Sequence, residues 1–316
     1  MRLFKYLHPD RINVLQNTSI RFTQPQYLND PFEQLPFISS ITTPERFDSI
    51  IETLRQKLSS HATLNQLDEN DLDEIIRPLP LNESERLKII HIFKQLPDFF
   101  NAYGSEILDD SENLNQLREV LCNPISPTTY SQQIKALLNQ WVGLLCLTQS
   151  NDNLLMWSHY ADGGKGYVIE FDPLHPFFKN SGYLIKKLDW LQKVKYPSKR
   201  PALVLFDRKR GMLDYLSSTI FLTKNRDWKY EKEIRLIRNL KEAYECVLHP
   251  TFGPIYLFRF DPSAILRVYL GVNVTPESEA KIVTILKEER YAHVELYKAT
   301  LNPKEYTLDF EPFRQL

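Results

Sequence analysis

The sequence contains little cysteine and no paired-cysteine motif. Cys122, Cys146 and Cys246 are the only three cysteines in 316 residues, they lie far apart, and none forms a CxxC pair. Their number and spacing argue against both a disulfide framework and a zinc site. We therefore expect buried free thiols in a reducing compartment, which indicates a cytoplasmic protein.

Long hydrophobic runs and an excess of one charge are also lacking. No window approaches the about 18 continuous apolar residues of a membrane-spanning helix, and the run at residues 3–7 is too short for a signal-peptide core. Thirty-nine basic and forty acidic residues give a formal net charge of -1. This charge removes any strong attraction to nucleic acid or an anionic membrane. We expect no membrane partner, and only a local basic patch would attract nucleic acid.

Several familiar catalytic motifs are missing. The chain has no Walker loop, no GxGxxG, no HExxH and no GxSxG. The common nucleotide-binding, protease and esterase interpretations therefore lose their usual support. The composition is that of a globular protein, with 42% hydrophobic and 25% charged residues. A chain of this length buries enough surface to fold without a metal or disulfide.

The hydrophobic periodicity predicts an α+β fold. The first forty residues indicate strand, helix and strand at residues 3–7, 10–16 and 20–23. From residue 43 to about 140 the pattern is helical and polar, with capping signals at Thr43-Pro44 and at Asn82 with Glu85. After residue 143 strands dominate, at 144–148, 166–171, 194–196, 233–237, 255–260, 266–270 and 294–298. A helix capped by Thr275 precedes the last of these. We predict a single domain, residues 1–316, with a mixed, mainly antiparallel sheet and a helical insertion at about 43–140.

A first polar motif, Asn-Asp-Pro-Phe-Glu at residues 29–33, follows the second predicted strand. Proline restricts the preceding Asp30 to extended conformations, and Asn and Asp side chains bond their own backbone in turns. The motif therefore predicts a rigid loop that presents Asn29 and Asp30 to a ligand. An exit turn into the helical insertion, with no ligand role, is an equally weighted interpretation.

A second motif is a short helix at residues 153–161, Asn-Leu-Leu-Met-Trp-Ser-His-Tyr-Ala, followed by three of the nine glycines at 163–166. Asn151 or Asp152 is the predicted N-cap, and Gly163 or Gly164 the left-handed C-cap. The glycines indicate a tight turn or a close backbone approach.

Two aromatic side chains of this helix, His159 and Tyr160, are adjacent in sequence and therefore point in different directions. One of them can pack while the other faces a cleft. A structural hydrogen bond is the more usual role for a histidine in such a place than catalysis.

A third motif, Tyr-Glu-Lys-Glu-Ile-Arg-Leu-Ile at residues 230–237, carries two carboxylates and a guanidinium. Strand alternation predicts Glu231, Glu233 and Arg235 on one face, with successive side chains of that face about 7 Å apart. The functional interpretation is a carboxylate held and tuned by Arg235. A solvated sheet face with cross-strand ion pairs is the alternative.

These motifs together resemble a large bacterial family, domain of unknown function two-nine-seven-one. The resemblance rests on Phe-Lys-Tyr at residues 4–6, the segment 25–32 ending in Asn-Asp-Pro-Phe, Leu-Met-Trp-Ser-His-Tyr-Ala at 155–161 and the third motif. The family description itself implies no activity.

The order of motifs also looks like that of ADP-ribosyltransferases, and this looser resemblance implies a use of NAD as substrate. It implies Glu233 as the carboxylate that stabilises an oxocarbenium-like state and Glu231 as the group that positions or deprotonates the acceptor. It also implies Tyr160 in the nicotinamide pocket and Tyr6 or Lys5 at the carboxamide. Further predicted binding residues are Asn29, Asp30, Trp157, Ser158, His159 and Arg235. The reaction would be transfer to nucleic acid or protein, or NAD hydrolysis, in a defence or toxin setting.

Two other functions remain open. Glu170, Asp172, Glu233 and Lys232 would suit a metal-dependent nuclease, because clustered carboxylates with a lysine hold magnesium beside a phosphodiester. A sensor or adaptor without catalysis is the third possibility. The transferase hypothesis predicts that Tyr6, Tyr160 and Glu233 line one cleft, bordered by the helical insertion, with Glu233 within reach of Arg235 or another polar group.

Overall fold

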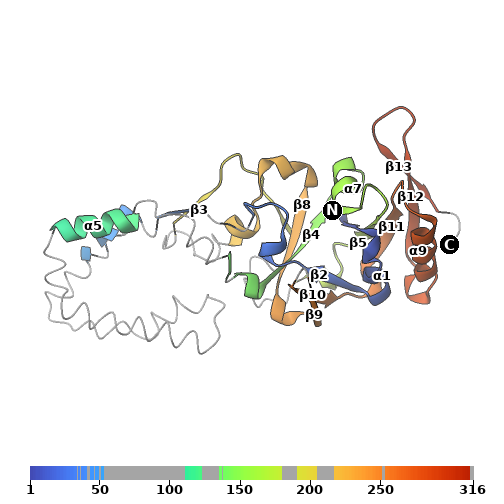
Figure 1. Cartoon of the computed structure of the whole chain (residues 1–316), viewed down its shortest axis with the longest axis horizontal. Coiled ribbons are helices and arrows are strands. Elements are labelled where there is room, and N and C mark those ends of the chain that lie inside the picture. The colour runs from blue at the N-terminus through green and yellow to red at the C-terminus, as the bar shows by residue number, and fades with distance from the viewer. Residues whose placement is uncertain are drawn as a thin grey trace. The chain divides into compact units, whose positions relative to one another are not determined.

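Figure 1 shows the computed structural model of the chain. The structure describes residues 1–33, 35, 37–40, 43–45, 47–49, 51–52, 111–122, 135–136, 138–179, 191–204, 217–250 and 253–313. The chain divides into two compact units, the first formed by Met1–Leu35, Lys135–Arg200 and Ser217–Leu316, the second by Pro36–Ile134 and Pro201–Leu216. The main sheet and the candidate site belong to the first unit. The single domain of residues 1–316 stays a prediction.

The strands of the first unit are β1 (Leu3–Leu7), β2 (Ser19–Phe22), β4 (Val142–Thr148), β5 (Tyr167–Phe171), β6 (Gln192–Lys193), β8 (Glu233–Asn239), β9 (Glu245–His249), β10 (Gly253–Arg259), β11 (Ile265–Leu270), β12 (Glu295–Leu301) and β13 (Leu308–Pro312). Its α-helices are α1 (Asn13–Asn17), α7 (Leu154–Tyr160) and α9 (Pro276–Leu286). The second unit contains β3 (Phe37–Ser40), α5 (Ser111–Cys122) and β7 (Ala202–Val204).

The main sheet has eight strands in the order β13-β12-β11-β5-β1-β4-β8-β6. Its pairs are antiparallel except β11 with β12, which run parallel. The predicted α+β class with a mixed, mainly antiparallel sheet is confirmed. The amino-terminal strand β1 lies in the middle, between β5 and β4, so residues from distant parts of the chain become neighbours on one sheet.

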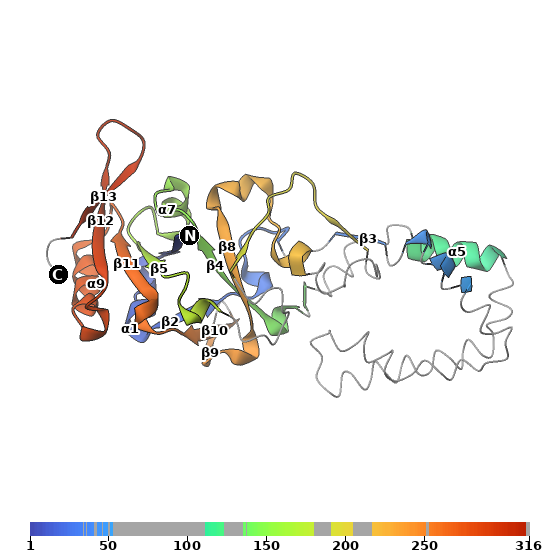
Figure 2. The ribbon, with the colours of Figure 1, turned by 180° about the vertical axis from the view of Figure 1, so that it is seen from behind.

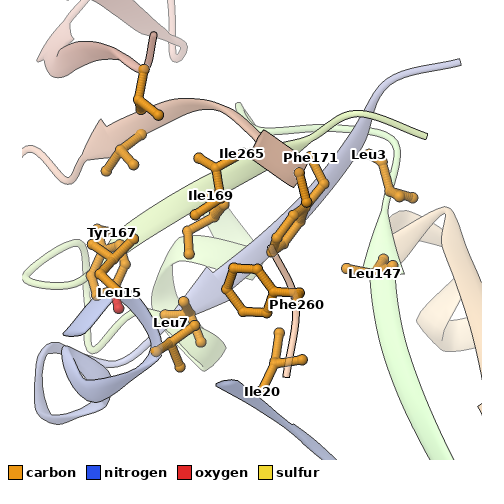
Figure 3. Close-up of a cluster of buried hydrophobic side chains, with 14 of the residues drawn as sticks. Leu3, Leu7, Leu15, Ile20, Leu147, Tyr167, Ile169, Phe171, Phe260 and Ile265 are labelled. Atoms are coloured by element: carbon orange, nitrogen blue, oxygen red, sulfur yellow. The ribbon is translucent and has the colours of Figure 1, made fainter. Parts of the chain in front are cut away.

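Each face of the sheet carries its own hydrophobic cluster. One face packs against α1 and α9, and Figure 3 shows part of this cluster: Leu3 and Leu7 of β1 beside Ile169 and Phe171 of β5, with Phe260 against them. Figure 2 shows α9 beside β12 at one end of the sheet. The other face packs against α7. There Phe4, Tyr6, Val168 and Tyr269 meet Trp157.

The glycine-rich turn after α7 is confirmed as a place of tight turning and close approach. Gly163 and Gly164 have φ values of +62° and +83°. A Cβ on Gly166 would lie 2.1 Å from the Leu7 carbonyl oxygen, and one on Gly271 would lie 2.0 Å from that of Gly164. The turn therefore packs backbone against backbone at the ends of β1 and β11, where a side chain has no room.

The predicted first strand and the helix capped by Thr275 match β1 and α9 within a residue or two. The strand predicted at 194–196 is wrong, because the short strand β6 ends at Lys193. Strands β3, β7, β9 and β13 were not predicted. Every residue of β9 is exposed, so its side chains show no alternation of buried and exposed positions that a sequence pattern reveals.

The predicted helical insertion is described only in part. Helix α5 lies within residues 43–140, and Phe47 and Ile51 of the predicted apolar stripe are buried against Leu114. The capping pair Asn82 and Glu85 lies outside the described residues. Whether the insertion borders the cleft stays a prediction.

Two expectations about composition have mixed outcomes. Among the described residues, no helix is long and apolar enough to cross a membrane. The three cysteines are free, but the prediction that all are buried is wrong, because Cys246 is exposed on β9 and the other two are half-buried. The location in the cytoplasm stays a prediction.

Candidate functional site

The main sheet opens between β1 and β4. The two strands pair only at Phe4 with Thr148, and further along β4 the backbone of Leu144 pairs instead with Thr23. Between these two points the Cys146 carbonyl accepts a hydrogen bond of 2.8 Å from Lys5 Nζ. An ammonium thus takes the place of a backbone donor, and the parted strands leave room for a cavity.

A cavity of about 240 Å³ lies at this opening. It is lined by β1, β4, α7, the loop that contains Asn29, and the segment from Lys224 to Glu233. Tyr6, Tyr160 and Glu233 are all among its lining residues. The predicted convergence of these three side chains is confirmed, and Lys5, Asn29 and Glu231 join them.

Lys224 connects the acidic residues of the cavity. Its Nζ lies 2.7 Å from Glu231 Oε2, 3.4 Å from Glu233 Oε2 and 3.7 Å from Glu33 Oε2. The lysine side chain is only 3% exposed. Burial alone would lower the pKa of Lys224, but attraction by Glu233 and Glu231 outweighs burial and raises it. Lys224 therefore stays a cation that holds the two carboxylates of the third motif together.

Arg235 lies behind the cavity and is completely buried. Its Nε and Nη2 donate to the two oxygens of Glu233 at 2.8 and 3.0 Å, and Nη1 donates to the Phe221 carbonyl at 2.6 Å. It is also ion-paired with Glu33. A two-pronged pair of this kind fixes the direction of the carboxylate as well as its charge. The prediction that Glu233 is held by Arg235 is confirmed.

The way in which Glu231 reaches the site differs from the prediction. Glu231 is not a strand residue: it ends a 3-10 helix, Arg226–Glu231, and Lys232 follows with a φ of +45° before β8 starts at Glu233. The Thr148 hydroxyl donates to the Glu231 carbonyl at 2.5 Å. The left-handed residue turns the chain so that both carboxylates face Lys224. Since both are buried, the alternative of a solvated sheet face is wrong.

A short hydrogen-bond chain joins α7 to Glu231. Asn29 Nδ2 donates to the Tyr160 hydroxyl at 2.6 Å, and this hydroxyl donates to Glu231 Oε1 at 2.5 Å. Burial and the Glu231 carboxylate raise the pKa of Tyr160, so the phenol remains a donor. Both oxygens of Glu231 are therefore bound, one by Tyr160 and one by Lys224.

The loop of the first motif, residues 29–33, is held in place by hydrogen bonds and contributes side chains to the site. Asp30 Oδ1 accepts from the Phe32 amide at 2.9 Å, the expected turn, and Oδ2 accepts from the Asn225 amide at 3.3 Å. Asp30 is buried and fixes the loop, whereas Asn29 lines the cavity. The interpretation of a mere exit turn is therefore incomplete, because the same loop brings Glu33 to Arg235.

The other predicted residues of α7 do not line the cavity. Trp157 is buried, donates to the Asn151 carbonyl at 2.8 Å and packs edge-on against Tyr6. Ser158 and His159 are exposed. The predicted N-cap is also wrong by one or two residues: Asn153 caps α7 by accepting from the Met156 amide. Since Asn153 also donates to the Tyr230 carbonyl at 3.3 Å, the cap ties α7 to the third motif.

Burial shifts the ionisation of three groups around the opening between β1 and β4. It lowers the pKa of Lys5, raises that of Glu233 and raises that of the Cys146 thiol well above its usual value. Lys224 opposes the shift at Glu233. The thiol is therefore a protonated neighbour of Glu233 and not a nucleophile.

The comparisons with known proteins point to one family. Residues 156–236 match the model of a family described as Protein of unknown function (DUF2971). The predicted family resemblance is confirmed over these residues, which include Tyr160, Glu231 and Glu233. Neither the curated proteins nor the solved structures contain a match to the chain.

The residues predicted to form the site of a metal-dependent nuclease do not come together. Glu170 stands three strands from Glu233 in the register β5-β1-β4-β8, about 14 Å away, and its oxygens accept from Arg2 and Tyr269. Lys232, inside the DUF2971 segment, is exposed. Among the described residues, no three His, Cys, Asp or Glu side chains are grouped to hold a metal ion.

Two site residues were missed by the sequence analysis, Lys224 and Glu33. Lys224 stands six residues before the third motif, in a stretch with no helix or strand pattern. Glu33 was seen only as the end of the first motif. The only sequence signal of these two residues is that each is charged and lies in or near a motif. Charge alone does not distinguish a buried side chain from a solvated one.

Proposed function

We propose that the protein binds NAD in the cavity between β1 and β4 and cleaves its nicotinamide-ribose bond, either to transfer ADP-ribose or to hydrolyse NAD. The observation that carries this proposal is the meeting of Glu231, Glu233, Tyr160 and Tyr6 around one cavity. Cleavage of the nicotinamide-ribose bond is favoured by carboxylates near the ribose and by aromatic side chains near the nicotinamide ring.

The two carboxylates suit the charge that develops during cleavage. As the bond to the nicotinamide breaks, positive charge grows on the ribose C1′ and its ring oxygen, as in glycoside hydrolysis. A preorganised carboxylate next to that carbon stabilises the charge. Glu233 is preorganised because Arg235 holds both of its oxygens. Glu231 is held by Tyr160 and Lys224 and is assigned to the acceptor nucleophile.

The β1 side of the cavity offers hydrogen-bond donors for the carboxamide of nicotinamide. Lys5 Nζ uses one of its three N–H groups on the Cys146 carbonyl. The Tyr6 hydroxyl is buried; the Asn153 backbone amide acts on its oxygen, while its own O–H has no acceptor among the described residues. A carbonyl oxygen of the ligand beside Lys5 Nζ would accept a hydrogen bond from one of its remaining N–H groups, and the nicotinamide would then leave on the side of β1, away from the carboxylates on the β8 side.

The size of the cavity limits what enters it. Pockets for drug-sized ligands measure roughly 300–1,000 Å³, so about 240 Å³ accommodates a ring with its sugar and not a whole dinucleotide. The nicotinamide and its ribose would be enclosed, with the diphosphate and the adenosine outside the opening.

The test is release of nicotinamide by the purified full-length chain incubated with NAD, with and without cellular RNA, DNA or protein, followed by chromatography. Glu233→Gln is expected to reduce release by about 10²–10³-fold, the usual loss when one stabilising group of a transition state is removed. Glu231→Gln is expected to reduce transfer to an acceptor more than hydrolysis.

Glu170→Gln is the matched control. Glu170 is also a buried carboxylate held by an arginine on the same face of the sheet, but it does not line the cavity. It tests whether loss of activity reflects lost stability or lost chemistry. Equal nicotinamide release by wild type and Glu233→Gln would contradict the assignment of Glu233.

A further inference from the structure

Three aromatic side chains gather beside the cavity without lining it. The rings of Trp228 and Tyr230 have centroids 6.1 Å apart, and the His159 ring lies 6.4 Å from each of them. They come from α7 and from the 3-10 helix 226–231, about seventy residues apart in the chain. We call these three residues the aromatic platform.

The platform adjoins the catalytic candidates directly. Lys224 Nζ, inside the cavity, lies 4.8 Å from the centroid of the Trp228 ring. The His159 ring is 6.3 Å from that of Tyr160, and Tyr230 directly precedes Glu231. A ligand on the platform would therefore extend the cavity rather than occupy a separate site.

Core packing does not account for the platform. Trp228 and His159 belong to neither of the two hydrophobic clusters of the sheet, and only Tyr230 packs against one of them. Trp228 and Tyr230 are half-buried and His159 is exposed. Large aromatic rings that remain accessible beside a cavity with charged side chains are the kind of surface on which flat bases stack.

The segment that carries the platform also provides positive charge. Arg226, Lys229 and Lys232 are exposed, against one exposed acid, Asp227. This local surplus stands out in a chain whose net charge is -1. Aromatic rings interleaved with basic side chains combine base stacking with attraction to phosphate.

We propose that the aromatic platform stacks a nucleobase next to the cavity. This inference deepens the proposed function, on which it rests for the reaction, by giving the site a nucleotide ligand outside the nicotinamide pocket. The base would belong either to the adenosine end of NAD or to a single-stranded nucleic acid acceptor, and the shared chemistry is a flat ring with an adjoining phosphate.

The test uses the fluorescence of Trp228, obtained as the difference between wild type and Trp228→Phe, because the chain has four tryptophans. AMP, NAD and a single-stranded oligonucleotide are titrated, with ribose 5-phosphate as the ligand that lacks a base. The base-containing ligands are expected to quench Trp228, and ribose 5-phosphate is not. Trp228→Ala should weaken binding, followed by calorimetry, about 5- to 150-fold.

Tyr244→Ala is the matched control, since Tyr244 is an exposed aromatic residue that follows β8 and stacks on Arg259 instead. It should leave binding unchanged. A steep loss of oligonucleotide affinity with salt, reduced in Lys229→Ala, would assign the base to nucleic acid. Tighter binding of NAD than of the oligonucleotide, with little salt dependence, would assign it to the adenine.

The inference is overturned if ribose 5-phosphate quenches as AMP does, or if Trp228→Ala binds every ligand as wild type does. Neither readout involves nicotinamide release. A chain that stacks bases but releases no nicotinamide would therefore overturn the proposed reaction while the platform stands.

Discussion

The Tyr6 hydroxyl is a buried donor whose O–H has no acceptor among the described residues, although the Asn153 backbone amide acts on its oxygen. The residue is 5% exposed, its ring packs edge-on against Trp157 at a centroid distance of 5.2 Å, and burial raises the pKa of the phenol. It therefore stays protonated and available as a donor. Since Tyr6 also lines the cavity, its O–H is a candidate donor to a ligand.

Replacing Tyr6 with phenylalanine should therefore separate binding from stability. We expect Tyr6→Phe to change the free energy of unfolding by less than about 0.5 kcal/mol, while the KM for NAD rises. Tyr167→Phe is the control: its hydroxyl donates to the Arg11 carbonyl at 2.8 Å, and its loss should cost about 1 kcal/mol. Urea denaturation and steady-state kinetics measure the two effects. A large stability loss in Tyr6→Phe would show that the hydroxyl serves the fold.

Helix α7 positions both the aromatic wall of the cavity and part of the platform. It has only seven residues, too few to be stable alone, so its position depends on its cap and its packing. Asn153 supplies the cap and also bonds the Tyr230 carbonyl. The direction of Tyr160 thus depends on a residue seven positions earlier.

Removing this cap should affect the site as well as the fold. Asn153→Ala is expected to cost about 1 kcal/mol of stability and to weaken binding of NAD, because α7 loses its link to the third motif. Thr275→Ala removes the equivalent cap of α9, where Thr275 Oγ1 accepts from the Ser278 amide, far along the chain from the cavity residues. It should cost a similar amount of stability and leave NAD affinity unchanged. Equal NAD affinity in both variants would contradict the role given to α7.

For the whole molecule, Glu170 predicts a dependence of stability on pH. Burial alone would raise its pKa, but hydrogen bonds from Arg2 and Tyr269 and the nearby charge of Arg267 hold it below the usual value of 4.5. The unfolded chain therefore binds this proton more readily than the folded one. The stabilisation from Glu170 is present above about pH 4.5 and is lost as the pH falls below it.

Glu170→Gln should accordingly flatten the decrease in stability on acidification, measured by urea denaturation from neutral pH down to about pH 2.5. Glu277→Gln is the control, since Glu277 pairs with Lys281 on the exposed surface of α9, where ion pairs contribute little. An unchanged pH profile in Glu170→Gln would show that other carboxylates control acid unfolding.

Local patterns predicted those parts of the chain whose structure depends on near neighbours. The class of the fold, the strand β1, the helix α9 and the turn at Asp30 follow from alternation, caps and proline, which act over a few residues. The same patterns failed at β9, whose side chains are all exposed. They also failed at Glu231, where strand alternation was extended into a 3-10 helix.

The sequence by itself determined which residues are chemically capable: the two glutamates, the tyrosines and the rigid loop before residue 33. Only the tertiary structure decided that β1 separates from β4, that Lys224 joins Glu231 to Glu233, and that Arg235 is buried between Glu233 and Glu33. The reason is that burial and ion pairing between distant segments depend on how the strands are ordered in the sheet. That order arises from contacts between residues far apart in the chain, which no local spacing encodes.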